Sequence, residues 1–194
     1  MYKISISERT LHFKQPAGTS RGVYTTRHSY YLQLTSDEAP GVEGVGECAT
    51  LPDLSCDAKP AYEMTLRQIC QMVEQMGRIP YDMIRAYPSI TFGLETAFAS
   101  FFEAARSKHL LATHGDAAGQ GTIAVPAWAQ NLASLYDSPF ARGEEGITIN
   151  GLVWMGTYEE MLARLEEKLK AGFHCVKLKI GAIDFFKELD LIKR

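Results

Sequence analysis

Two lysines separated by one residue are the feature of this sequence best suited to chemistry. They lie in VKLKI, residues 176–180, a run typical of a β-strand. Successive side chains of a strand point to opposite faces, so Lys177 and Lys179 share one face and the apolar residues share the other. If the apolar face packs beneath helices, two amines are left side by side on the opposite face.

A close pair of amines can do acid–base chemistry. Neighbouring ammonium groups repel and burial disfavours charge, so one amine can lose its proton near neutral pH and serve as a general base. Two alternatives use the same residues. A barrel lysine can form a Schiff base with a carbonyl substrate, and lysines exposed on an edge strand can merely discourage aggregation.

The elements around this strand favour the catalytic interpretation. Residues 147–154 form a predicted buried strand, and Thr157 with Glu160 forms a capping box that starts a helix. Gly172 is predicted to end that helix, because helices commonly end at a glycine in the left-handed conformation. Residues 173–180 form the next predicted strand, and a further helix begins near Ile183. The inward stripe of the first helix is apolar: Met161, Leu162, Leu165 and Leu169.

Strand–helix–strand–helix is the repeating unit of a parallel α/β structure. The apolar residues 176, 178 and 180 would face the helices, and both lysines would face the middle of a barrel, near the end where barrel active sites form. A closed (β/α)₈ barrel takes about 250 residues, and parallel strands need both faces covered. We therefore expect the rest of the barrel, or another chain, to cover residues 146–194.

The first 110 residues show a different sequence pattern. Residues 2–7, 28–35 and 42–48 alternate as strands, separated by a predicted loop at 15–22 and a turn at 36–41. This order predicts an antiparallel meander. On the second strand, one face carries three large residues: Tyr30, Leu32 and Leu34.

Two helices follow the meander. Apolar residues at helical spacing predict a helix from about Pro60 to Gly77. A second helix would be capped by Ser89 and run to about Lys108, with an aromatic stripe that belongs to the core. Residues 112–145 have no clear periodicity, and their glycine-rich stretch lacks the ending of a phosphate-binding loop. The predicted architecture is an α+β domain with a linker at 1–145, then the first two βα units of a barrel at 146–194.

Composition excludes several classes of function. The 194 residues include 20 basic and 23 acidic ones, for a formal net charge of −3, and no basic stripe that could bind nucleic acid. No signal peptide or membrane-spanning run is visible. The four cysteines form no CxxC pair or zinc-type cluster, which predicts buried, reduced thiols in a cytoplasmic protein.

Four stretches together resemble the o-succinylbenzoate synthases. GVGECATLPDLS (44–55) resembles their GxGE…PLPxxS stretch, and PSITFGLETA (88–97) resembles the entry to their second helix. INGL (149–152) is similar to their first barrel strand. VKLKIG (176–181) is similar to the KxK strand of the muconate-lactonizing branch of the enolase superfamily. The matches follow the family's order and cover nearly the whole chain.

The resemblance implies a capping domain over a modified TIM barrel and assigns roles to several residues. Lys179 would be the acid/base, and Lys177 would tune it beside the substrate carboxylate. Loops around residues 18–21 and 51–55 would close over the substrate, a small carboxylate. The implied substrate contacts are Gly18, Arg21, Leu51, Leu54 and Ser55.

The resemblance also implies a cofactor and a reaction. Mg²⁺ would hold the substrate carboxylate and stabilise the enediolate formed when the α-proton leaves. Loss of water from a cyclohexadiene carboxylate would then give o-succinylbenzoate, a precursor of menaquinone. The family's metal ligands would lie beyond Arg194, so we expect no metal site and no activity in the 194-residue chain by itself.

Rival functions remain open at this point. An N-succinylamino acid racemase, a dipeptide epimerase and a cycloisomerase all use a KxK lysine with the same enediolate chemistry. A non-catalytic binding or assembly module, with merely solvated lysines, is the alternative of another class.

Overall fold

The computed structural model describes residues 1–19, 22–112, 122–134, 136 and 138–194. The chain divides into two compact units. Unit 1 comprises Met1–His12 and Thr26–Glu144, and unit 2 comprises Phe13–Thr25 and Glu145–Arg194. Within the described ranges, no helix is long and apolar enough to cross a membrane.

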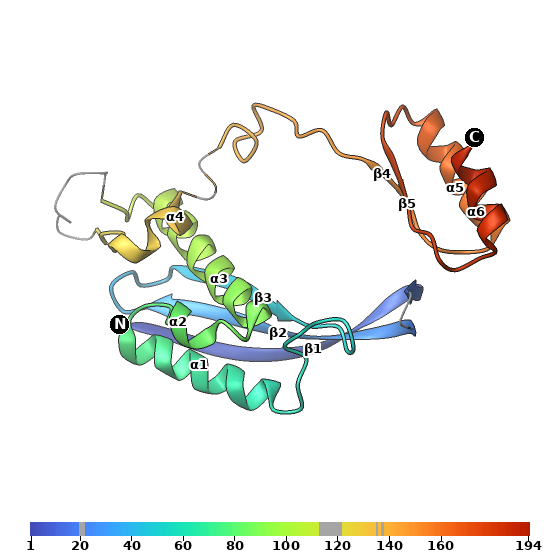
Figure 1. Ribbon diagram of the computed structural model, residues 1–194. Helices are drawn as coiled ribbons and strands as arrows, with labels where there is room; N and C mark the ends of the chain where they lie inside the picture. The colour runs from blue at the N-terminus through green and yellow to red at the C-terminus, as the bar shows by residue number, and fades with distance from the viewer. Residues whose placement is uncertain (20–21, 113–121, 135, 137) are drawn as a thin grey trace. The chain divides into compact units, whose positions relative to one another are not determined.

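The elements follow one another as strands, helices and then an alternation of the two (Figure 1). In chain order they are β1 (Tyr2–Thr19), β2 (Gly22–Ser36), β3 (Glu43–Ala49), α1 (Tyr62–Met76), α2 (Tyr81–Ile84), α3 (Pro88–Ser107), η1 (Ala127–Ala129), α4 (Gln130–Ala133), β4 (Gly151–Val153), α5 (Tyr158–Lys170), β5 (Val176–Leu178) and α6 (Phe185–Ile192).

The first three strands form one sheet in the order β1-β2-β3, which confirms the predicted meander. Strands β2 and β3 are antiparallel, with Leu32 opposite Gly46 and Leu34 opposite Gly44. The predicted loop at 15–22 is too long, because residues 15–19 belong to β1 and β2 starts at Gly22; residues 20–21 lie outside the described residues. Since β1 is an edge strand, it tolerates the missing N–H of Pro16.

One face of this sheet is buried beneath α1 and α3. Leu32 and Leu34 are fully buried and Tyr30 is partly buried against the same core, which confirms the predicted inward face. The ring of Tyr2 on β1 meets Phe98 of α3 edge-on at 4.9 Å between centroids. The aromatic stripe of α3 is core, as predicted, since Phe98, Phe101 and Phe102 have no exposed surface.

Helix α3 lies unusually close to β3, and glycines make the approach possible. A Cβ atom at Gly46 would lie 1.8 Å from the carbonyl oxygen of Gly93, and one at Gly44 would lie 2.1 Å from that of Ala97. Real Cβ atoms essentially never approach other atoms so closely, so neither glycine can be replaced without moving the helix. The alternating glycines of the GVGE segment therefore set the spacing between sheet and helix.

Both predicted helices of unit 1 are present, but one predicted cap is wrong. Helix α1 ends at Gly77 with a left-handed φ of 65°, as expected for a glycine C-cap. Helix α3 begins at Pro88 after an N-cap residue, Tyr87, that makes no side-chain cap. Ser89 lies inside the helix, and its own backbone N–H is bound by a carboxylate from outside the helix.

The C-terminal part of unit 2, Glu145–Arg194, consists of two short parallel strands with two helices packed on one face. The capping box of Thr157 and Glu160 is present, and Gly172 follows the helix with a φ of 86°, as predicted. Helix α6 starts two residues after Ile183, capped by the side chain of Asp184. The buried cluster consists of Val153, Met161, Leu165 and Leu191.

Three predictions for unit 2 need correction. The strands are shorter than predicted, because β4 and β5 pair over three residues each. Leu169 was predicted to face inward but is 50% exposed; the residue of the last turn of α5 that lies against β4 is Lys168, close to Gly151. Ile180 was predicted on the packed face but is 53% exposed, because it follows the paired part of β5 and precedes the turn at Gly181.

Candidate active site

The lysine pair lies on a parallel strand, as the order of elements predicts. Strand β5 pairs with β4 in parallel, with Leu152 opposite Lys177 and Val153 opposite Leu178. The backbone N–H of Lys179 donates to the carbonyl oxygen of Val153 at 3.0 Å, which continues the ladder one residue beyond the strand. The backbone of both lysines is therefore fixed by β4.

The two lysines lie on the face of the β4–β5 pair opposite the helices. Val176 and Leu178 are half-buried and pack against the cluster beneath α5 and α6. Lys177 is exposed and Lys179 is half-buried. Alternation along the strand therefore puts both amines on the open face, beside Leu152, which is 42% exposed.

Trp154 is a neighbour of Lys179 that the sequence did not single out. It directly follows β4, and the Nζ atom of Lys179 lies 5.6 Å from the centre of its ring. A cation over an indole face is attracted by the ring's negative face. The only indication in the sequence is that Trp154 closes the predicted strand 147–154, at the end where barrel active sites form.

The turn after the lysine strand is held by a buried carboxylate, also missed from the sequence. The Oε1 atom of Glu188 in α6 accepts from the backbone N–H groups of Gly181, at 2.6 Å, and Ala182, at 3.3 Å. Gly181 has a φ of 99°, which a side chain rarely permits. A glutamate in the first turn of a helix is usually explained by its favourable interaction with the helix dipole. The sequence therefore did not predict that Glu188 binds the turn that precedes its helix.

The predicted substrate contacts Leu51, Leu54 and Ser55 lie together in one closed turn of unit 1. The backbone N–H of Leu51 donates to the Ser55 hydroxyl, and the Ser55 N–H donates to the Leu51 carbonyl oxygen, both at 3.0 Å. Leu54 is 39% exposed, so it offers an apolar side chain at the surface of the turn. Gly18 is half-buried near the end of β1, and Arg21 lies outside the described residues.

A buried aspartate anchors this turn to α3. Asp57 is 1% exposed, and its Oδ2 atom accepts from the backbone N–H of Ser89 at 2.8 Å and from the Ser89 hydroxyl at 2.6 Å. The Tyr62 hydroxyl shares a hydrogen bond of 2.5 Å with Ser89. Burial, more than any partner, raises the pKa of Tyr62. The carboxylate therefore fills the capping role that the sequence assigned to Ser89.

The cysteines only partly match their prediction. Of the four, all free, Cys48 and Cys70 are buried but Cys56 and Cys175 are exposed. Burial raises the pKa of Cys70 to about 12 and raises that of Cys48 further. The buried thiols are thus held in their unreactive, protonated form.

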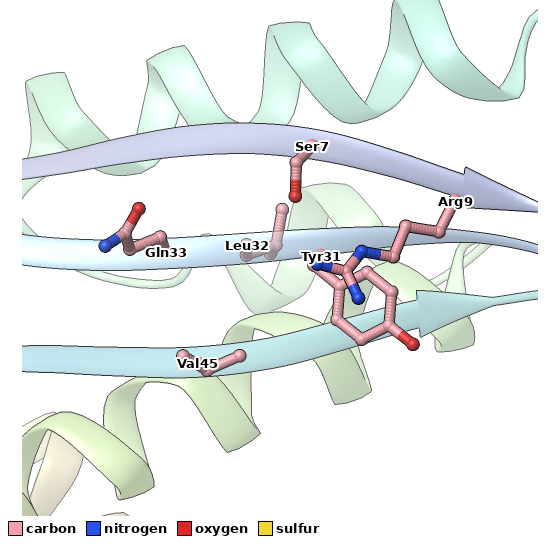
Figure 2. Close-up of a pocket in the computed structure, with 6 residues that line it drawn as sticks. All are labelled: Ser7, Arg9, Tyr31, Leu32, Gln33 and Val45. Atoms are coloured by element: carbon pink, nitrogen blue, oxygen red, sulfur yellow. The ribbon is translucent and has the colours of Figure 1, made fainter.

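A shallow hollow on the open face of the first sheet is separate from every predicted site residue. It measures about 300 Å³ and is lined by residues of β1, β2 and β3: Ser7, Arg9, Tyr31, Leu32, Gln33 and Val45 (Figure 2). Figure 2 shows the Arg9 side chain beside the Tyr31 ring, and its guanidinium carbon lies 5.7 Å from the ring centre. No carboxylate or histidine lines the hollow, so its described residues offer no acid–base pair.

The described residues also offer no metal site. Nowhere in these ranges do three or more His, Cys, Asp or Glu side chains come together in a group that could hold a metal ion. The described residues therefore do not fit a resident Mg²⁺ ion.

Sequence comparison finds one curated relative of clear similarity, and no protein-family model matches. The chain is 31% identical to the o-succinylbenzoate synthase of Desulfotalea psychrophila over 200 residues. This alignment covers 98% of the chain but 52% of the relative. The chain thus spans about half the length of the curated relative it matches.

Solved structures agree on the fold. The crystal structure of MenC from Desulfotalea psychrophila matches with a TM-score of 0.57 and 23% identity, over 99% of this chain and 52% of that one. An enolase family member from Agrobacterium tumefaciens, with homology to dipeptide epimerases, matches with a TM-score of 0.63 and 13% identity, over 100% and 50%. The chain has the fold of the N-terminal half of an enolase-superfamily protein. Its three-stranded meander with helices has the fold of an enolase capping domain and is followed by short parallel strands.

A third matching structure contains a metal ion. The o-succinylbenzoate synthase of Thermosynechococcus elongatus, complexed with Mg in its active site, matches with a TM-score of 0.55 and 21% identity, over 99% of this chain and 46% of that one. About half of each of these enolase-superfamily structures therefore has no counterpart in the present chain.

Proposed function

We propose that this chain is part of a Mg²⁺-dependent lyase that dehydrates a cyclohexadiene carboxylate to o-succinylbenzoate. The observation that carries the proposal is the lysine pair on one open face of a parallel strand, in a chain 31% identical to an o-succinylbenzoate synthase. In this proposal residues 1–145 form the capping domain and linker, and residues 146–194 form the first two βα units of the barrel. The remainder of the barrel, or another chain, covers the open face of β4 and β5.

In the proposed reaction Lys179 removes the proton α to the substrate carboxylate. The C–H bond breaks, the proton passes to the Nζ atom of Lys179, and the electron pair is delocalised into the carboxylate as an enediolate. Collapse of the enediolate then breaks the C–O bond to the β-hydroxyl group, which takes the proton from the Nζ atom of Lys179 and leaves as water, giving the aromatic product. Lys177, on the same face, would attract the negative charge that develops on the carboxylate.

The substrate contacts and the metal belong to the same proposal. Leu51, Leu54 and Ser55, with Gly18 and Arg21, would contact the substrate from the capping domain. The Mg²⁺ ligands would be supplied from outside this chain, since its described residues form no suitable group. We therefore expect the 194-residue chain alone to bind no Mg²⁺ and to be inactive, and we expect a cytoplasmic location for the whole protein. Metal-dependent dehydration by the 194-residue chain would contradict this part of the proposal.

A second candidate is a racemase or epimerase. The structural match with the Agrobacterium tumefaciens relative of dipeptide epimerases has the higher TM-score, 0.63 against 0.57 for MenC. Both reactions begin with removal of the α-proton. In racemisation or epimerisation a proton then returns to the same carbon, whereas in dehydration water is lost. The face of β5 that carries the lysines serves both reactions equally.

Product analysis with the full-length protein separates the candidates. The protein is offered the cyclohexadiene carboxylate, N-succinyl amino acids and dipeptides in parallel, with and without a chelator. We expect dehydration of the first substrate, with loss of activity on chelation that added Mg²⁺ restores. Turnover of dipeptides or N-succinyl amino acids alone would assign the second candidate. Borohydride trapping of a carbonyl substrate on either lysine would instead support Schiff-base chemistry.

A further inference from the structure

Glu188 is the only buried charged residue among the described residues of unit 2. It is 6% exposed although it lies on α6, a helix whose other polar residues are largely at the surface. Removing a carboxylate from water is costly unless hydrogen bonds replace the lost solvation. The cost suggests that this carboxylate has a positional task that an apolar side chain could not perform.

The hydrogen bonds of Glu188 go to a single place. Its Oε1 atom accepts from the backbone N–H groups of Gly181 and Ala182, the two residues that begin the turn between β5 and α6. Charge-assisted bonds of this kind are roughly twice as strong as neutral ones. The other end of the turn is fixed separately, because Asp184 accepts from the N–H groups of Phe186 and Lys187.

This turn begins one residue after Ile180 and two residues after Lys179. On the strand side, the N–H of Lys179 is bound to the carbonyl oxygen of Val153. On the turn side, the chain is bound again at Gly181. Lys179 is therefore held between one attachment to β4 and another to α6, while Ile180 between them has no buried side chain to fix it. Loss of either attachment would let the end of the strand change direction.

We infer that Glu188 is a positioning residue that fixes the direction of the Lys179 amine by holding the turn after β5. The inference rests on the proposed role of Lys179 as the base. Proton transfer demands a donor and acceptor aligned at close distance, and a displacement of about 1 Å can cost about 100-fold in rate. Glu188 itself, bound to two backbone groups, does not need to touch the substrate.

The test compares three substitutions of Glu188 in the full-length protein. Glu188→Leu removes the acceptor, Glu188→Gln keeps an oxygen at the same distance without the charge, and Glu188→Asp keeps the charge but shortens the reach. For Glu188→Leu we expect kcat to fall about 100-fold with KM nearly unchanged. Glu188→Gln should restore most of kcat, and Glu188→Asp should lie between the two. Glu159→Leu, at an exposed glutamate of α5, is the matched control and should leave both constants unchanged.

Two outcomes would overturn the inference. One is a Glu188→Leu protein that keeps the kcat of the wild type. The other is a Glu188→Gln protein that loses as much as Glu188→Leu, because the charge and not the attachment would then matter. If Glu188→Leu fails to fold, Glu188→Asp decides, and an unchanged kcat in that variant would count against the inference.

A second readout separates this inference from the proposed function. Competitive acetylation followed by mass spectrometry measures the reactivity of the Lys179 amine relative to Lys170, without any substrate. We expect Glu188→Leu to change the relative reactivity of Lys179 and Glu188→Gln to preserve it. If the wild-type protein turns over none of the substrates, the proposed function fails, and the acetylation result alone judges the position of Lys179. Unchanged reactivity in a folded Glu188→Leu or Glu188→Asp protein would overturn the inference.

Discussion

The two units of this chain differ in how far they complete their own cores. Unit 1 buries a continuous apolar cluster between its sheet and helices, including three phenylalanines of α3 with no exposed surface. Among its described residues, unit 2 buries four apolar side chains and leaves others exposed, among them Leu152 beside the lysines. Phe185 and Phe186 on α6 are 63% and 76% exposed. The lysine pair therefore lies in the unit with the smaller described core.

This difference is consistent with the division of labour in a barrel enzyme. A parallel sheet is stable only when both faces are covered, so its first two strands are incomplete in isolation. The open face is also the face that carries Lys177 and Lys179. In the proposed enzyme, the face that unit 2 leaves uncovered is thus the face that would contribute to the active site.

The largest expected effect tests the close packing of unit 1. Gly46→Ala would place a Cβ atom 1.8 Å from the carbonyl oxygen of Gly93, so α3 must move away from β3. We expect a loss of more than about 4 kcal/mol in unfolding free energy, or failure to fold. Thermal unfolding followed by circular dichroism measures it, with Gly146→Ala, where nothing lies within 4 Å, as the control. Equal melting temperatures for the two variants would show that the helix and sheet are not in close contact.

A slightly smaller effect tests the core of α3. Phe98→Ala should cost about 3–5 kcal/mol, because it leaves a cavity among rings that are fully buried. Phe92→Ala removes the same ring from the same helix at a position that is 61% exposed, and should cost under about 1 kcal/mol. Urea denaturation of both variants gives the difference. Similar costs would mean that the predicted inward face of α3 is wrong.

Thiol chemistry sharpens the comparison by showing which residues are enclosed. Iodoacetamide at pH 8 should modify Cys56 and Cys175 at least about 100-fold faster than Cys48 and Cys70, and denaturant should abolish the difference.

Because burial raises the pKa of Cys70 from about 9 to about 12, the folded state binds this proton more tightly than the unfolded state. Its contribution to stability is complete below pH 9 and is lost as the pH rises toward 12. Stability that increases over that range would contradict the assignment.

The smallest effect concerns the capping box of unit 2. Thr157→Ala removes the acceptor for the Glu160 N–H and should cost about 1 kcal/mol. Amide hydrogen exchange at Glu160 should accelerate roughly five-fold, and Thr157→Ser should preserve most of the protection. An unchanged exchange rate in Thr157→Ala would indicate that α5 is held by packing alone.

The sequence predicted correctly those features that depend on neighbouring residues alone, namely strand alternation and helix caps. Alternation placed Leu32 and Leu34 inward, Gly77 and Gly172 ended their helices, and Thr157 with Glu160 started one. The loop at 15–22 was predicted too long because Pro16 and Gly18 are turn formers, and the sequence does not reveal that β1 is an edge strand that tolerates them.

Long-range partners were beyond a single sequence. Asp57 binds Ser89, 32 residues away, and Glu188 binds a turn that precedes its own helix. Each looks like an ordinary surface carboxylate until the fold brings its partner near. The lysine pair was predictable because both its spacing and its place in the order of elements are local.

The most direct test of the account is the turnover of the cyclohexadiene carboxylate by the full-length protein and its Lys179→Ala variant. Lys170→Ala, at an exposed lysine of α5, is the control. Removing a general base typically costs about 10²–10⁴ in rate, and we expect Lys179→Ala to lose kcat within this range while its circular dichroism spectrum is unchanged. A Lys179→Ala protein that forms o-succinylbenzoate at the wild-type rate would contradict the central claim.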